Sequence, residues 1–163
     1  MSSRPARLFC DCMLGGLAKW LRAVGHHAAF LPEIDDAEVV RRIGRTGEIL
    51  LTSDAPLLER RAFTRGDHRG LFVPRHAKID DQLKFVMTEL GLPILPPRCM
   101  ACGGALHAVS REQVTEDVPP RSLRAFDVFY RCEDCRQVFW HGRHWDRIVE
   151  KRNWLEGELS RSP

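Results

Sequence analysis

Two Cys-x-x-Cys pairs constrain this chain more than any other feature of its sequence. Cys99 and Cys102 form the first pair, Cys132 and Cys135 form the second, and 29 residues separate the two pairs. Zinc prefers four tetrahedral thiolates, and each pair supplies two of them from one tight turn. Apolar segments that predict short strands flank both pairs, as in a zinc ribbon. Because four sulfur ligands leave no open position, we expect a structural zinc ion rather than a catalytic one.

The alternative for these cysteines is two disulfides, which require an oxidising compartment. Residues 1–5 lack the apolar run of a signal peptide, and no stretch approaches the roughly 20 apolar residues of a membrane helix. We therefore expect a cytoplasmic protein without a membrane partner, whose cysteines stay reduced. The other two cysteines, Cys10 and Cys12, are interpreted as small buried apolar residues.

Short apolar runs alternate with amphipathic segments through the first half of the chain. After the first run, Leu14, Leu17 and Leu21 recur at the spacing of one buried helical face. Four successive strand–helix units predict an α/β fold with a mostly parallel sheet and helices on both sides. The predicted strands are residues 7–10, 28–31, 48–52 and 70–73.

The pattern changes after a proline-rich segment at residues 93–97, which predicts a stiff linker. Beyond it we expect the short strands of the ribbon and then a final helix over about residues 144–158. The sequence therefore predicts two parts, a sheet domain at residues 1–95 and a zinc ribbon with a C-terminal helix at residues 96–163.

An acidic residue follows each of the four predicted strands, at or near the start of the next helix. The carboxyl ends of parallel strands share one edge of the sheet, where ligands bind in open α/β folds. Carboxylates gathered there repel one another unless a cation neutralises them, and oxygen-only ligands suit Mg²⁺ or Mn²⁺. In chain order these residues are Asp11, then Asp35 and Asp36, then Asp54, and finally Asp80 and Asp81.

Each of these aspartates has a simpler alternative as a helix N-cap, a position that aspartate favours. Asp35 is followed three residues later by Glu38, which matches a capping box. Asp11 is the residue that capping explains least, because it comes directly after the first strand and before the apolar helical pattern begins.

Three segments of the chain resemble those of one known family. Residues 9–22 read FCDCMLGGLAKWLR, residues 49–54 read ILLTSD, and residues 139–145, after the last cysteine, read FWHGRHW. Together with the paired cysteines, they resemble the Mut-seven C-terminal ribonuclease domain family, a branch of the PIN-domain nucleases that carries a zinc ribbon. The resemblance extends from about residue 7 to residue 148.

The resemblance implies a PIN-like, three-layer domain that cuts RNA with water activated by Mg²⁺ or Mn²⁺. Matched residue by residue, Asp11 and Asp54 are the expected metal ligands. Asp36 and Asp81 match the other acidic positions, with Asp35 and Asp80 as competing choices. Thr52 matches a residue that hydrogen-bonds a carboxylate and holds it in place.

Basic and aromatic residues supply candidates for contact with RNA. Lys19 and Arg22 lie three apart, on one face of the first predicted helix, and suit phosphates; the alternative is a solvated helix face. After the last cysteine, aromatic residues alternate with basic ones, a pattern that suits single-stranded nucleic acid. The two tryptophans there have the alternative of filling the small ribbon core. The segment comprises Trp140, His141, Arg143, His144 and Trp145.

We therefore expect a metal-dependent ribonuclease that acts on RNA, most simply single-stranded RNA, with the ribbon assisting RNA binding. One rival is a non-catalytic RNA-binding module whose acidic edge is vestigial. Another is a toxin-like nuclease that a partner protein holds silent. The net charge is a weak guide, since 25 basic residues face 22 acidic ones.

Overall fold

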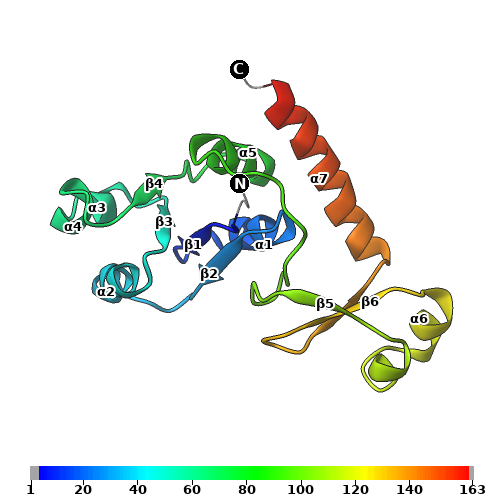
Figure 1. Cartoon of the computed structure of the whole chain (residues 1–163). Coiled ribbons are helices and arrows are strands. Elements are labelled where there is room, and N and C mark those ends of the chain that lie inside the picture. The colour runs from blue at the N-terminus through cyan, green and yellow to red at the C-terminus, as the bar shows by residue number, and fades with distance from the viewer. Residues whose placement is uncertain (1–3, 162–163) are drawn as a thin grey trace.

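The computed structural model describes residues 4–161, and the masked ends include part of the N-terminal segment considered above. Its first part is built on a four-stranded parallel sheet with the strand order β2-β1-β3-β4 (Figure 1). The prediction of a mostly parallel sheet is confirmed. The strands are β1 (Arg7–Cys10), β2 (His27–Phe30), β3 (Ile49–Thr52) and β4 (Gly70–Phe72).

Alternation along the two central strands produces three layers. Leu8 of β1 and Leu51 of β3 face one side and pack with α1 and α5, while Phe9 and Leu50 face the other side and pack with α2 and α3. Helices therefore cover both faces of the sheet, as the sequence predicted. The helices of this part are α1 (Gly15–Ala23), α2 (Asp36–Thr46), α3 (Ala55–Leu58), α4 (Arg61–Thr64) and α5 (Ile79–Glu89).

The segment after β3 departs from the single helix that the sequence predicted. Arg60 has an extended backbone, with φ −63° and ψ 145°, and separates α3 from α4. Leu58 of α3 and Phe63 of α4 both pack over Gly70, where a Cβ atom would lie 2.4 Å from Leu58 Cδ2. The break thus lets two short helices close over the start of β4.

A second, antiparallel sheet with the order β5-β6-β7 follows the linker. After the linker the sequence predicted only short strands and a final helix, and it missed two short helices before β6, η1 (Glu112–Val114) and α6 (Pro120–Ala125). The other elements are β5 (Leu106–Val109), β6 (Phe129–Cys132), β7 (Val138–Trp140) and α7 (Arg143–Arg161).

The last helix, α7, returns to the first part of the molecule and runs past α5 (Figure 1). Leu155 of α7 is fully buried in the same core as α1 and α5. Nη1 of Arg152 donates to the carbonyls of Ala23 (3.0 Å) and Leu95 (2.6 Å). The division between residues 1–95 and 96–163 stays a prediction, since the two parts share this core.

The linker itself is pinned to the end of α1. Leu95 N donates to Val24 O (3.0 Å), and Arg98 N donates to Arg22 O (2.9 Å). Gly25 makes this approach possible, because it has φ +101° and a Cβ atom there would lie 2.7 Å from the Leu95 carbonyl.

Among the described helices, none is both long and apolar enough to cross a lipid bilayer.

Candidate functional site

At the carboxyl edge of the sheet, the hydroxyl of Thr52 links the Asp11 carboxylate to the backbone of Asp54. Thr52 Oγ1 donates to Asp11 Oδ2 and accepts from the backbone N–H of Asp54 (2.9 Å). The Asp11 carboxylate also accepts from Ser53 N (3.2 Å) and Met13 N (3.0 Å). The contact with a carboxylate that the sequence suggested for Thr52 is therefore present, and Thr52 itself is fully buried.

The two carboxylates differ in their surroundings. Asp11 is only 7% exposed, and three donors occupy most of the roughly four acceptor positions of its carboxylate. Asp54 is half-buried before α3, yet its side chain does not cap that helix and has no partner among residues 4–161. The edge thus combines a rigidly held carboxylate with a free one.

The acids after β2 make other contacts. Asp35 caps α2 by accepting from Glu38 N (2.8 Å), so its N-cap interpretation is confirmed. Asp36 is exposed and pairs with Arg60 (3.2 Å), a partner that nothing in the sequence indicated. Since both side chains of this pair are about half exposed, the pair contributes at most about 1 kcal/mol.

The acids after β4 also separate. Asp80 forms an ion pair with Lys151 of α7, whose ammonium lies 4.3 Å from the centre of the Trp20 ring. Asp81 is exposed and has no partner in the described part of the chain. Within residues 4–161, no three acidic side chains form a compact metal-binding group, and the cysteine quartet is the only such group.

The cysteines around Asp11 differ from each other. Cys10 is fully buried, and burial raises the pKa of its thiol to about 12, so it packs as a neutral apolar side chain as expected. Cys12 is exposed, so its interpretation as a buried residue is wrong. The reason is local, because the strand ends at Cys10 and the chain turns outward before α1.

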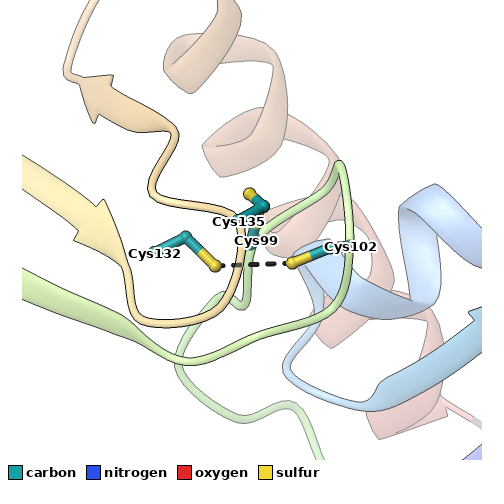
Figure 2. A group of neighbouring side chains, drawn as sticks. All are labelled: Cys99, Cys102, Cys132 and Cys135. Carbon is teal, nitrogen blue, oxygen red and sulfur yellow. Dashed lines mark hydrogen bonds between the residues drawn. The ribbon is translucent and has the colours of Figure 1, made fainter. Parts of the chain in front are cut away.

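The four cysteines of the two pairs meet in one group, drawn in Figure 2. Their sulfur atoms all lie within 4.8 Å of one another. Sγ of Cys102 lies 3.4 Å from Sγ of Cys132, and Sγ of Cys99 lies 3.6 Å from Sγ of Cys135. Tetrahedral zinc–thiolate bonds of 2.3 Å place sulfurs about 3.8 Å apart, whereas a disulfide needs about 2.05 Å. The group therefore suggests a structural zinc ion.

Both cysteine turns have the same backbone design. Gly103 N donates to Cys99 O (2.7 Å), and Arg136 N donates to Cys132 O (3.2 Å). The residue after each pair is left-handed, with φ +86° at Gly103 and +67° at Arg136. Gly104 fits closely as well, because a Cβ atom there would lie 2.7 Å from the sulfur of Cys132.

Burial explains why a cation suits the two thiols of the first pair. Desolvation raises the pKa of the Cys99 thiol to about 12, and it raises the pKa of Cys102 as well. A buried thiol that does not ionise on its own becomes a thiolate when a metal ion compensates its charge. The quartet thus has the donor chemistry of a closed zinc site.

Arg22 joins the first cysteine turn to α1, and it does not face solvent as the sequence interpretation expected. It is 6% exposed, and its Nε donates to Ala28 O (2.7 Å). Its Nη1 donates to the carbonyls of Met100 (2.8 Å) and Ala101 (3.1 Å). The predicted role of Arg22 in RNA binding is corrected to a structural one, because its guanidinium is already committed to three backbone carbonyls.

We expect Arg22→Lys to lower the free energy of unfolding by about 1.5–3 kcal/mol, because hydrogen bonds to a charged group are lost. A lysine ammonium keeps the charge but lacks the planar fork that reaches separate carbonyls. Urea denaturation of the zinc-loaded protein measures this. Arg41→Lys is the control, since the Arg41 side chain is 59% exposed and its replacement should change the value by less than about 0.5 kcal/mol. Equal losses in both variants would contradict this role.

The structure brings together two of the other residues predicted to contact RNA. Lys19 of α1 and His144 of α7 line one groove, with Trp140 and Arg143. Trp145 lies outside it, in a cluster of three rings in which its centre is 5.3 Å from Tyr130 and 4.7 Å from His141. The sequence did not indicate that the first cysteine turn would also line this groove, through Met100 and Ala101.

The fold and the cysteine geometry define an α/β sheet domain joined to a four-cysteine, ribbon-like metal centre. Comparison with known protein families is consistent with this class. The family model described as "Mut7-C RNAse domain" matches residues 6–152, so the chain belongs to the Mut7-C RNAse domain family.

A curated relative adds distant support. The chain is 37% identical over 108 residues to the human protein named "Exonuclease mut-7 homolog". This match covers 61% of the chain but only 12% of the human protein. No solved structure matches the chain.

Proposed function

We propose that this protein is a metal-dependent ribonuclease that hydrolyses phosphodiester bonds at the carboxyl edge of its parallel sheet. The observation that carries the proposal is the Thr52 hydroxyl, which ties the Asp11 carboxylate to the backbone of Asp54. Two acids more than forty positions apart in the sequence thereby share one edge. Membership of the Mut7-C RNAse domain family supports RNA as the substrate.

The residues at this edge fit a hard divalent cation. Mg²⁺ is commonly held by one or two carboxylates together with substrate phosphates, so three acids are not required. Asp11 keeps one acceptor position free, and the whole Asp54 carboxylate is free among the described residues. Bound there, Mg²⁺ or Mn²⁺ would activate water and stabilise charge on the leaving oxygen of the phosphodiester.

The chain's own groups prepare this edge. Thr52, Ser53 and Met13 fix the orientation of Asp11, and such supporting hydrogen bonds hold a ligand ready for its ion. Asp36 and Asp81, which follow β2 and β4 along the chain, are the additional catalytic acids of this proposal, and Asp36 joins only when it releases Arg60. Lys19 and His144 contact RNA phosphates. Arg22 is no longer among the proposed RNA-binding residues.

The ribbon has a structural zinc ion and assists in binding RNA in the single-stranded form. We place the nuclease domain at residues 1–95 and the ribbon with its C-terminal helix at residues 96–163. Zinc binding requires reduced thiols, which favours the cytoplasm as the compartment. The absence of a compact acidic group among residues 4–161 favours one rival function, an RNA-binding module without catalysis.

Cleavage of labelled single-stranded RNA distinguishes these two functions. The zinc-loaded protein is dialysed free of other divalent cations and then assayed with Mg²⁺, with Mn²⁺ and with neither. We expect cleavage products only when a cation is added. RNA that binds equally well in all three conditions and stays intact would instead establish the binding module.

A further inference from the structure

A groove of about 450 Å³ lies between α1 and the ribbon, on the side of the first cysteine turn. Lys19 lines it from α1, Met100 from the cysteine turn, and Trp140, Arg143 and His144 from β7 and the start of α7. We propose that this groove binds one nucleotide of a single-stranded RNA, with the base against Trp140 and the flanking phosphates on the basic residues. The inference rests on the proposed function and names the subsite that holds its substrate.

The charge of the groove selects an anion. Three basic side chains surround it, from Lys19, Arg143 and His144, and none of its lining residues is acidic. All three are exposed, and within residues 4–161 none has an ion-pair or hydrogen-bond partner. In contrast, basic residues nearby on α7 are engaged, as Lys151 is with Asp80 and Arg152 with backbone carbonyls. Three free basic groups thus line one groove, where a phosphate would meet them.

The floor of the groove suits a base. Phe139 and Trp140 line it together with Met100, so apolar and aromatic surface lies below the basic rim. Trp145 contacts Tyr130 and His141 and packs against the cysteine cluster outside the groove. Trp140 lines the groove itself, so it is the tryptophan that a base bound there would meet. Gly142 borders the same indole, and a Cβ atom there would lie 3.2 Å from Trp140 Nε1. A base that stacks on an aromatic side chain and phosphates that meet free cations are the two elements of single-strand recognition.

The groove also has a fixed position relative to the acidic edge. Lys19 lies four residues into α1, roughly 6 Å along the helix axis from Gly15, and α1 starts just after Asp11. Arg22, one turn further along, bonds to Met100 and Ala101 and so holds the ribbon wall of the groove against α1. A strand anchored in this groove is thus held at a set distance from Asp11 and Asp54, which positions the bond to be cut.

Fluorescence anisotropy with the zinc-loaded full chain tests the groove without requiring cleavage. The probe is a labelled single-stranded RNA of about 12 nucleotides, within the site sizes of single-strand-binding folds. Without added divalent cation, Trp140→Leu should weaken binding by about 5- to 100-fold, since stacking is lost while apolar volume remains. Lys19→Ala should weaken binding and lower the slope of log K against log salt by about 0.7.

The matched control is Arg124→Ala, which removes an exposed arginine of α6 outside the groove and should change neither affinity nor slope. Zinc content and thermal midpoint are compared for every variant, so that weaker binding is not mistaken for unfolding. Equal RNA affinity in Trp140→Leu, Lys19→Ala and the parent protein overturns the proposal that this groove binds RNA. An equal loss of affinity in Arg124→Ala overturns it as well. Normal binding without cleavage counts against the proposed nuclease only, so the two failures are distinguishable.

Discussion

Replacement of Cys132 by serine is expected to release zinc and unfold the ribbon while the parallel sheet stays folded. Metal binding in small zinc modules contributes about 10–16 kcal/mol to folding at neutral pH. The small apolar clusters of the ribbon do not make up for the loss of that free energy. Hydrogen exchange measured by mass spectrometry should show lost protection in β5, β6 and β7, with β1 and β3 still protected. The zinc content should fall from one ion per chain to none.

Cys12→Ser is the matched control, because Cys12 is an exposed thiol outside the quartet. It should keep its zinc and its full protection. A Cys132→Ser protein that lacks zinc and still protects β6 would show that apolar packing alone holds the ribbon, and the structural role of the metal would be lost. Loss of zinc in Cys12→Ser would contradict the assignment of the four ligands.

Much of this organisation could be predicted because it depends on local patterns. Apolar runs predict the four strands, and helical spacing predicts α1 with Leu17 and Leu21 on its buried face. The two cysteine pairs predict that all four side chains lie together, since a closed metal site requires four ligands in one place. Asp35 was recognisable as a cap because a cap is made by residues three positions apart.

The rest depended on contacts between distant segments, which spacing does not reveal. Lys19 and Arg22 share a helix face, yet the cysteine turn covers only Arg22. The partner of Arg22 in that turn, Met100, lies 78 positions away in the sequence. The pairing of Asp36 with Arg60 and of Asp80 with Lys151 arises in the same way. The helical break at Arg60 follows from packing over Gly70 rather than from a helix-breaking residue.

Asp54→Asn and Asp11→Asn are each expected to lower the rate of RNA cleavage by at least about 100-fold. Loss of a supporting hydrogen bond alone costs 10–100-fold at metal sites, and the ligand itself counts for more. Asp54 is the cleaner position, because its side chain has no hydrogen bond in the described part of the chain and its replacement leaves the fold unchanged. At Asp11 the asparagine amide also faces a donor at Ser53 or Thr52, which costs about 1–3 kcal/mol of stability.

Asp127→Asn is the control for both changes, since it removes an aspartate whose side chain is 91% exposed on the ribbon. It should cleave RNA at the parent rate. Thermal midpoints measured alongside separate a loss of chemistry from a loss of fold, and RNA affinity in the absence of divalent cation should be the same in the parent and Asp54→Asn proteins.

The most direct test of the acidic edge is the single-turnover rate of single-stranded RNA cleavage in saturating Mn²⁺, compared between the parent, Asp54→Asn and Asp127→Asn proteins. A functional edge predicts rapid cleavage by the parent and Asp127→Asn proteins and a rate at least about 100-fold lower for Asp54→Asn. Equal rates for all three folded proteins would contradict it and would place any hydrolytic centre elsewhere in the molecule.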